Sequence, residues 1–264
     1  KTVRRQRQMC IRDRFMTNAK VQNTLKQLNQ LKMSGVNENI GNKPKNRYGN
    51  KKSSKSKTSD SSISVNNSSI EDQKTINSLE SLDSLKDFMA NYDKCKLHES
   101  ATNMVFSDGN PKSEIMLIGE APGHDEDIQG KPFVGRSGKL LDKMLEAINL
   151  NREKVYIANI VPWRPPNNRR PTDEEIDMCL PMIKKHIELI NPKAILLLGS
   201  TATYALIRNT EGITKIRGKW VDIEINKKKY PTLPTFHPAF LLRQPGQKKY
   251  SWEDLKSLKK KVES

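Results

Sequence analysis

The segment GEAPGHDEDIQGKPFVG, residues 119–135, combines a Gly/Pro turn with a group of carboxylates. Such a turn can present backbone amides to an anion or a carbonyl oxygen. A phosphate-binding loop would not carry so much negative charge, and the pattern GxxxxGK[ST] is absent. Carboxylates can orient or deprotonate water, so the segment supplies candidate general bases, although a solvated acidic turn is the simpler alternative. The carboxylates are Glu120, Asp125, Glu126 and Asp127.

Phe133 and Asn159 could together recognise a flat, polar molecule. Phe133 lies between Pro132 and Val134, where it serves either as core or as a stacking surface. Asn159 ends an expected strand, and its amide offers one donor group and one acceptor, which suits the edge of a pyrimidine. A turn-forming Asn is the alternative.

The segment NIVPWRPPNNRRP, residues 159–171, places three arginines among prolines. Prolines restrict the backbone, so we expect a rigid basic loop that can contact phosphates. The arginines are Arg164, Arg169 and Arg170.

The segment TFHPAFLLRQPG, residues 235–246, places an imidazole beside bulky apolar residues and an arginine. Two prolines bracket the apolar run, which predicts a loop rather than a helix or strand. Proteins that kink DNA or extrude a base insert an apolar or arginine side chain into the base stack. A loop folded over the core is the alternative. The residues concerned are His237, Leu241, Leu242 and Arg243.

These segments must be positioned by the elements that precede them. Short apolar runs predict buried strands at 114–120, 155–161 and 194–200, with more strand material at 219–225 and up to 236. Helical patterns lie at 137–150, with Ser137 as N-cap, and at 172–190, with Thr172 and Glu175 as a capping box. Alternation of strands and helices predicts a mostly parallel sheet covered on both faces. Ligands bind such sheets at the carboxyl ends of the strands, which selects 119–135, 159–171, 199–201 and 236–246.

The N-terminal part of the chain has a different composition. The net charge of the 264 residues is +17, and residues 1–60 hold 16 Lys/Arg against 3 Asp/Glu. We interpret residues 1–15 as non-native read-through. Residues 16–74 are a basic, largely disordered tail, in which 17–33 could form a short helix. The catalytic domain is then 75–264.

Composition also limits the location of the protein. No apolar run reaches the roughly 18 residues of a membrane span, and no secretory leader is apparent. Three cysteines, Cys10, Cys95 and Cys179, form no disulfide framework. We therefore expect a cytoplasmic monomer that is not attached to a membrane.

Taken together and in order, these motifs resemble a family 4 uracil-DNA glycosylase. GNP at 109–111 and ITKIRGKW at 213–220 also fit, and the resemblance covers roughly residues 92–258. It implies a three-layer α/β/α sandwich with a central four-stranded, mostly parallel sheet. It also implies that uracil is flipped out of DNA and its N-glycosidic bond hydrolysed, so the expected partner is uracil-containing DNA.

The resemblance also implies roles for individual residues. Phe133 stacks on uracil, Asn159 bonds its polar edge, and His237 lies against O2. Backbone amides of the turn at Gly119, Glu120 and Ala121 hold the carbonyls, and the loop 239–245 enters the minor groove. The catalytic carboxylate stays open among Glu120, Asp125 and Glu126. Contacts to DNA are expected from Arg164, Arg169, Leu241, Leu242 and Arg243.

One departure concerns the [4Fe–4S] cluster that many members of this family hold through four cysteines. Two of the four positions are Tyr92 and Trp163, so only Cys95 and Cys179 remain. Thiolates hold such clusters, and we therefore expect no cofactor and no metal. A zinc ion bound by these cysteines with His98 or His186 is the alternative, without a close-spaced ligand pair to support it.

Three other functions fit parts of the sequence. A glycosylase of the same superfamily could prefer another base such as hypoxanthine, and a relative could bind DNA without strong catalysis. An unrelated α/β hydrolase is disfavoured because the chain has no G-x-S-x-G motif.

Overall fold

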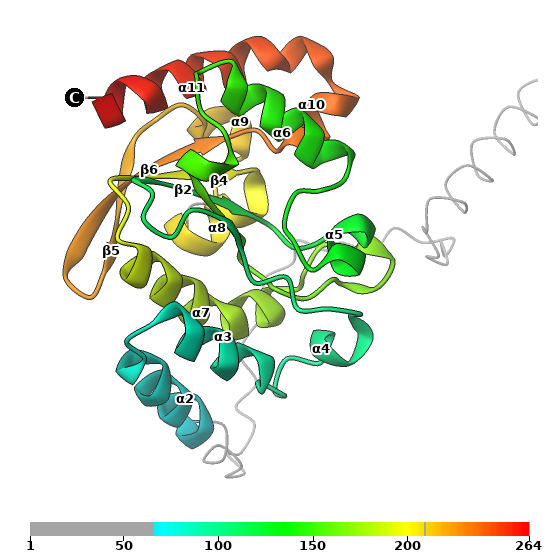
Figure 1. Ribbon diagram of the computed structural model, residues 1–264, viewed down its shortest axis with the longest axis vertical. Helices are drawn as coiled ribbons and strands as arrows, with labels where there is room; N and C mark the ends of the chain where they lie inside the picture. The colour runs from blue at the N-terminus through cyan, green and yellow to red at the C-terminus, as the bar shows by residue number, and fades with distance from the viewer. Residues whose placement is uncertain (1–65, 209, 264) are drawn as a thin grey trace, which may run out of the picture. The chain divides into compact units, whose positions relative to one another are not determined.

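The computed structural model describes residues 66–208 and 210–263. The predictions for residues 1–15, for the helix at 17–33 and for most of the basic tail lie outside the described residues. Within them, a central sheet is covered by helices on both faces (Figure 1). In this part of the chain no helix has the length and apolar character needed to cross a membrane.

Six strands form the sheet, in the order β1-β3-β2-β4-β6-β5. The inner four are parallel, as predicted, and the short β1 and β5 add antiparallel edges. Gly119 pairs with Asn159 and Leu198 with Thr235, so the inner strands end level with one another. We call this the carboxyl edge. The strands are β1 (Asp108–Gly109), β2 (Ile115–Gly119), β3 (Tyr156–Asn159), β4 (Ala194–Leu198), β5 (Val221–Ile225) and β6 (Lys228–Thr235).

Two apolar clusters hold the helical layers against the sheet. On one face, Leu141 and Leu145 of α6 pack with Leu255 of α11. On the other, Ile183 of α7 packs with Leu85 of α3. The three-layer α/β/α sandwich is confirmed (Figure 1).

The helices follow the expected pattern of alternation with the strands. The α-helices are α2 (Asn66–Ser78), α3 (Leu82–Ala90), α4 (Leu97–Ser100), α5 (His124–Gln129), α6 (Arg136–Glu146), α7 (Asp173–Ile190), α8 (Ser200–Ile207), α9 (Ile213–Ile216), α10 (Pro238–Arg243) and α11 (Lys248–Glu263). Short 3₁₀ turns are η1 (Arg152–Lys154), η2 (Pro166–Asn168) and η3 (Pro245–Gln247).

Three local predictions were wrong and one was confirmed. Helix α2 begins at Asn66, inside residues 16–74, which were expected to be a largely disordered tail, and it buries Ile76. Gly135, not Ser137, is the N-cap of α6. The segment 238–243 is helix α10 and not a loop, because proline at the first helical position lacks only an N–H that has no helical partner there. The capping box of Thr172 and Glu175 is present.

Candidate active site

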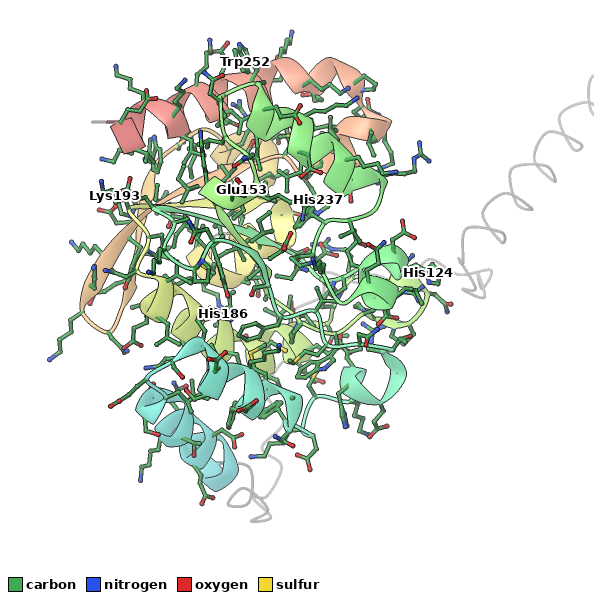
Figure 2. The ribbon with its side chains drawn as sticks, in the orientation of Figure 1. His124, Glu153, His186, Lys193, His237 and Trp252 are labelled. Atoms are coloured by element: carbon green, nitrogen blue, oxygen red, sulfur yellow. The ribbon has the colours of Figure 1, made fainter. Side chains whose placement is uncertain are left out.

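A cavity of about 650 Å³ opens at the carboxyl edge. The segments that leave the four inner strands supply its walls, in the order Asn159, Glu120, Gly199 and His237 across the sheet. In Figure 2, His237 lies within the body of the domain, whereas His124 projects from α5 at the periphery. The ends of parallel strands therefore bring together the segments that the sequence selected.

Phe133, Asn159 and His237 line this one cavity. The rings of Phe133 and His237 lie with centroids 5.6 Å apart and planes inclined by 32°. Gly119 makes the arrangement possible, because a Cβ there would lie 2.4 Å from Oδ1 of Asn159 and 2.6 Å from Cζ of Phe133. The aromatic surface, the amide and the imidazole thus share one hollow, as the sequence predicted.

Phe133 adopts a backbone conformation that is unusual for a bulky residue. Its φ is 55°, in the left-handed region, and the ring is buried. The guanidinium of Arg152 donates hydrogen bonds to the carbonyl oxygens of Phe133 and Pro132. Gly138 of α6 leaves room for that turn, since a Cβ there would lie 1.7 Å from the Phe133 oxygen. These contacts fix the backbone conformation of Phe133, and that conformation fixes the position of the ring.

Arg152 was missed by the sequence analysis. It lies in η1, far along the chain from Phe133, and belongs to none of the three motifs. Asp108 and Asp142 fix its guanidinium at 2.7 and 2.8 Å. No periodicity or spacing signals this contact, because it depends on how β1 and α6 pack beside η1.

The two leading carboxylates are in different environments. The carboxylate of Glu126 accepts three backbone hydrogen bonds, at 3.1 Å from Gly123 and at 2.9 Å from Val134 and Gly135. These bonds occupy both oxygens and tie α5 to the turn that carries Phe133. Glu120 also borders the cavity, as Glu126 does, but its side chain is 29% exposed and accepts a hydrogen bond from Thr201. The oxygens of Glu126 are thus engaged by the backbone, and Glu120 is the more accessible of the two carboxylates.

The other two acidic residues of the segment are not placed to contact a ligand in the cavity. Asp125 is exposed on α5 and does not border the cavity. Asp127 is buried and accepts hydrogen bonds from the backbone amides of Thr102 and Asn103.

The hydrogen bonding of His237 defines its tautomer. Nδ1 accepts a hydrogen bond of 3.1 Å from the backbone amide of Ala239, so the ring proton is on Nε2. Burial, assisted by the charge of Arg243, lowers the pKa of His237 from 6.5 to about 4. A neutral imidazole with an Nε2–H donor is therefore present at neutral pH.

Asn159 carries a buried acceptor that the protein does not use. Its Oδ1 has no hydrogen-bond partner among the described residues, and the side chain is only 6% exposed. Leaving a buried polar atom unpaired costs about 1–3 kcal/mol, which a bound donor would recover. The residue is therefore arranged for a ligand.

The arginines of the basic loop are held by other parts of the protein. Arg164 donates to Asn168 at 2.7 Å, and Arg169 forms an ion pair with Glu175 at 2.6 Å. Arg170 donates to Thr201 at 2.7 Å. Arg169 and Arg170 border the cavity with Arg243, and Arg164 does not. These bonds restrain the arginine side chains of the loop.

Leu241 and Leu242 are adjacent in α10 but differ in burial. Leu241 is fully buried in the core, so the expectation that it is exposed for insertion is wrong. Leu242 is 38% exposed, and Arg243 beside it is also exposed. The helical turn explains the difference, because successive residues of a helix point about 100° apart.

The four positions at which the sequence resemblance implies a metal cluster meet in the core. Tyr92 and Trp163 stack with ring centroids 6.5 Å apart and planes inclined by 13°. Beside them lie the free thiols of Cys95 and Cys179, whose mutual hydrogen bond lowers the pKa of Cys95 to about 7 and raises that of Cys179. Burial raises the pKa of Tyr92 to about 12, so its phenol stays protonated. These residues do not fit a four-thiolate cluster.

The described residues contain no group of three or more His, Cys, Asp or Glu side chains arranged to hold a metal ion. His186 packs against the rings of Phe106 and Tyr156, and burial lowers its pKa to about 3. The structure therefore does not support the zinc alternative.

Comparison with known proteins gives consistent matches. The Uracil DNA glycosylase superfamily matches residues 106–258. The chain is 42% identical over 186 residues to a Type-4 uracil-DNA glycosylase of Sulfurisphaera tokodaii, covering 69% of this chain and 84% of that protein. For the protein of the same name from Saccharolobus solfataricus the identity is 43% over 191 residues, with coverages of 70% and 88%. For that from Thermotoga maritima it is 46% over 150 residues, with coverages of 56% and 77%.

Replacing Arg152 should destabilise the fold substantially. Arg152→Met leaves two carboxylates and two carbonyls without their donor, and we expect a loss of about 2–4 kcal/mol in the free energy of unfolding. Lys154→Met is the control, because Lys154 is an exposed residue of the same turn, and its change should stay within about 0.5 kcal/mol. Urea denaturation measures both variants. Equal losses in the free energy of unfolding would contradict the role of Arg152 in holding the turn that carries Phe133.

His237 should remain neutral well below the ordinary range of an imidazole. Burial of the ring and the nearby charge of Arg243 lower the pKa of His237, so we expect the ring to titrate near pH 4 in the folded protein. Since the unfolded pKa is 6.5, this group's contribution to stability is complete above that pH and declines as pH falls toward 4. NMR titration, with His237→Gln for assignment, measures the midpoint, and a value near 6.5 would contradict the argument that burial keeps the ring neutral.

Proposed function

The chain belongs to the uracil-DNA glycosylase superfamily, and from that premise we propose how its site recognises and releases the base. The protein is a uracil-DNA glycosylase, a hydrolase that excises uracil in DNA repair. Hydrolysis of the N-glycosidic bond frees the base and leaves an abasic site. The steps below assign that reaction to particular atoms.

We propose that uracil leaves the base stack to enter the cavity. The recognition groups lie within a hollow behind the carboxyl edge, where a base still stacked in a duplex could not reach them. The exposed Leu242 and Arg243, at the end of α10, are placed to occupy the gap left in the stack. Arg169, which lines the cavity and is paired with Glu175, would contact a flanking phosphate.

The unpaired Oδ1 of Asn159 is the observation that carries the assignment of the base. Uracil offers an N3–H donor beside its O4 acceptor, which complements the oxygen and the NH₂ group of one carboxamide. Cytosine has an acceptor at N3 and a donor at C4, so it would leave these groups mismatched inside the site. Mismatches of this kind discriminate strongly, because buried polar groups are left unpaired. Phe133 supplies the stacking surface for the same ring.

His237 stabilises the leaving group. As the glycosidic bond breaks, negative charge develops on O2 of uracil, and a preorganised Nε2–H donor stabilises that charge more than the ground state. Loss of one such donor typically costs about 10²–10³ in rate. A neutral donor does this without moving a proton at the moment of reaction. His237→Ala is therefore expected to lower turnover while DNA affinity stays near that of the wild type.

We assign to Glu120 the role of orienting or deprotonating the attacking water. Its side chain borders the cavity, whereas the oxygens of Glu126 are engaged by three backbone amides. A carboxylate here offsets the positive charge of the oxocarbenium-like sugar and orients or deprotonates the attacking water. The turn that includes Gly119 and Ala121 positions the Glu120 carboxylate. The backbone amides of the same turn can donate to the carbonyl groups of the base.

We propose that the protein functions without an iron–sulfur cluster. The stacked Tyr92 and Trp163 fill the volume between α3 and the loop after β3, and the free thiols of Cys95 and Cys179 share a hydrogen bond. No step of the reaction is assigned to this region.

We also propose that the protein acts as a monomer in the cytoplasm. One chain supplies every side chain of the proposed reaction, and the two neighbouring thiols suit a reducing compartment.

Uracil release should depend on Asn159 in a way that stability does not. Because Oδ1 makes no hydrogen bond within the described structure, Asn159→Leu should keep the melting temperature while lowering uracil release by about 100-fold or more. Release from a labelled U:G duplex and from single-stranded DNA measures activity, and thermal unfolding measures stability.

Substrate controls complete this test. Hypoxanthine carries the same donor–acceptor edge on a larger ring and is the alternative substrate, whereas thymine tests exclusion at C5. Absence of uracil release by the wild type would overturn the proposed function. Preferred release of hypoxanthine would redirect it to the alternative.

The purified protein should contain no iron–sulfur cluster. We expect no absorbance near 400 nm above the protein background and far less than one iron per chain after anaerobic purification. Tyr92→Cys/Trp163→Cys, which restores four thiols, is the matched variant and should acquire iron on reconstitution. A brown wild-type preparation with stoichiometric iron would refute the proposal.

A further inference from the structure

The turn between β4 and α8 contacts both sides of the cavity. Gly199 has φ of 95°, and a Cβ there would lie 2.8 Å from Cβ of His237. Two residues later, Thr201 enters the first turn of α8 with a side chain that is 2% exposed. Its hydroxyl contacts the carboxylate of Glu120 on the opposite side of the turn. No motif of the sequence singled out this threonine.

The hydrogen bonds of the Thr201 hydroxyl have one possible direction. The Nη2 atom of Arg170 lies 2.7 Å from the threonine oxygen, and a guanidinium can only donate. The hydroxyl therefore accepts from Arg170, and its single proton is free to point to Oε2 of Glu120. An ionised carboxylate can only accept, so the bonds run from Arg170 through Thr201 to Glu120. The charge at each end strengthens the bonds of the hydroxyl between them.

This arrangement fixes one oxygen of the carboxylate and leaves the other outside the chain of bonds. Oε2 of Glu120 faces Thr201, with Nε of Arg170 at 3.9 Å. A carboxylate that rotated freely about its terminal bond would hold water in many orientations. Fixing Oε2 restricts that rotation, so Oε1 has a defined position beside the cavity.

We propose that Thr201 is a positioning residue that aligns Glu120 for the attack of water on the sugar, with Arg170 setting the direction of its hydroxyl proton. The proposal rests on the role assigned above to Glu120. Thr201 itself is not among the residues that line the cavity. It acts through the carboxylate, so its effect should appear in turnover and not in substrate binding.

Thr201→Val tests the proposal, because valine keeps the shape of threonine and removes the hydroxyl. We expect kcat for uracil release to fall by about 10- to 100-fold, with KM near the wild-type value. Thr201→Ser keeps the hydroxyl and should restore most of the turnover. Thr203→Val is the matched control, since Thr203 is a buried residue of the same helix whose hydroxyl bonds the carbonyl of Gly199 at 2.8 Å.

A double-mutant cycle separates positioning from a structural effect on α8. In a Glu120→Gln background the charge that Thr201 orients is gone, so adding Thr201→Val should change single-turnover rates less than about twofold. An equal fold reduction in both backgrounds would overturn the proposal, as would wild-type kcat in Thr201→Val. If valine prevents folding, Arg170→Met serves instead, because Arg170 is 68% exposed. It should lower kcat in the wild-type background and not in Glu120→Gln, and an unchanged kcat would also overturn the proposal.

The controls distinguish this inference from the proposed function. A wild-type protein that releases no uracil contradicts the glycosylase assignment. A wild-type protein that releases uracil, with a Thr201→Val variant of equal kcat, contradicts only the role of Thr201.

Discussion

The site depends on one geometric constraint, which is that four adjacent parallel strands end level at one edge of the sheet. Asn159 directly ends β3, Glu120 follows β2, and His237 follows β6, so a few residues of chain suffice to bring three different functional groups to one cavity. Short connections of this kind leave little conformational freedom to lose when substrate binds. Gly119 and Gly199 complete the arrangement, because any larger residue would separate the groups that meet across the strand ends.

The aromatic surface of the cavity requires a strained backbone conformation, which lowers the stability of the folded state. A bulky residue with positive φ costs roughly 1–3 kcal/mol, and Phe133 carries that strain in the folded state. Hydrogen bonds to a charged group contribute roughly 1.5–3 kcal/mol each, and Arg152 makes two to the backbone of this turn. The two hydrogen bonds from Arg152 are therefore strong enough to offset the strain at Phe133. Since Asp108 and Asp142 hold the arginine, the position of the ring depends on β1 and α6 as well as on its own segment.

Sequence reasoning was effective where a single segment determines the outcome. Buried strands followed by polar residues identified the carboxyl edge, and the segments that follow these strands contain Phe133, Asn159 and His237, which line one cavity. Sequence reasoning failed where the structure of a segment depends on how its successive helical turns orient its side chains. Two prolines suggested a loop at 238–245, yet Pro238 suits the first helical position, and the resulting turn buries Leu241 while exposing Leu242. Arg152 and Thr201 were beyond reach for another reason. Their importance comes from partners 19 and 81 residues away in the chain, and no local pattern records such contacts.

The core beside α3 lies on the face of the sheet opposite to the aromatic surface of the cavity. Tyr92, Cys95, Trp163 and Cys179 belong to the apolar cluster on the α7 face, whereas Phe133 belongs to the one on the opposite face. The connection between this core and the cavity runs through the loop that begins at Trp163 and ends in the arginines. Burial of Trp163 anchors the start of that loop, and Arg170 at its end donates to Thr201, which holds Glu120. The stacked rings of Tyr92 and Trp163 hold this end of the loop through buried apolar area and ring contacts.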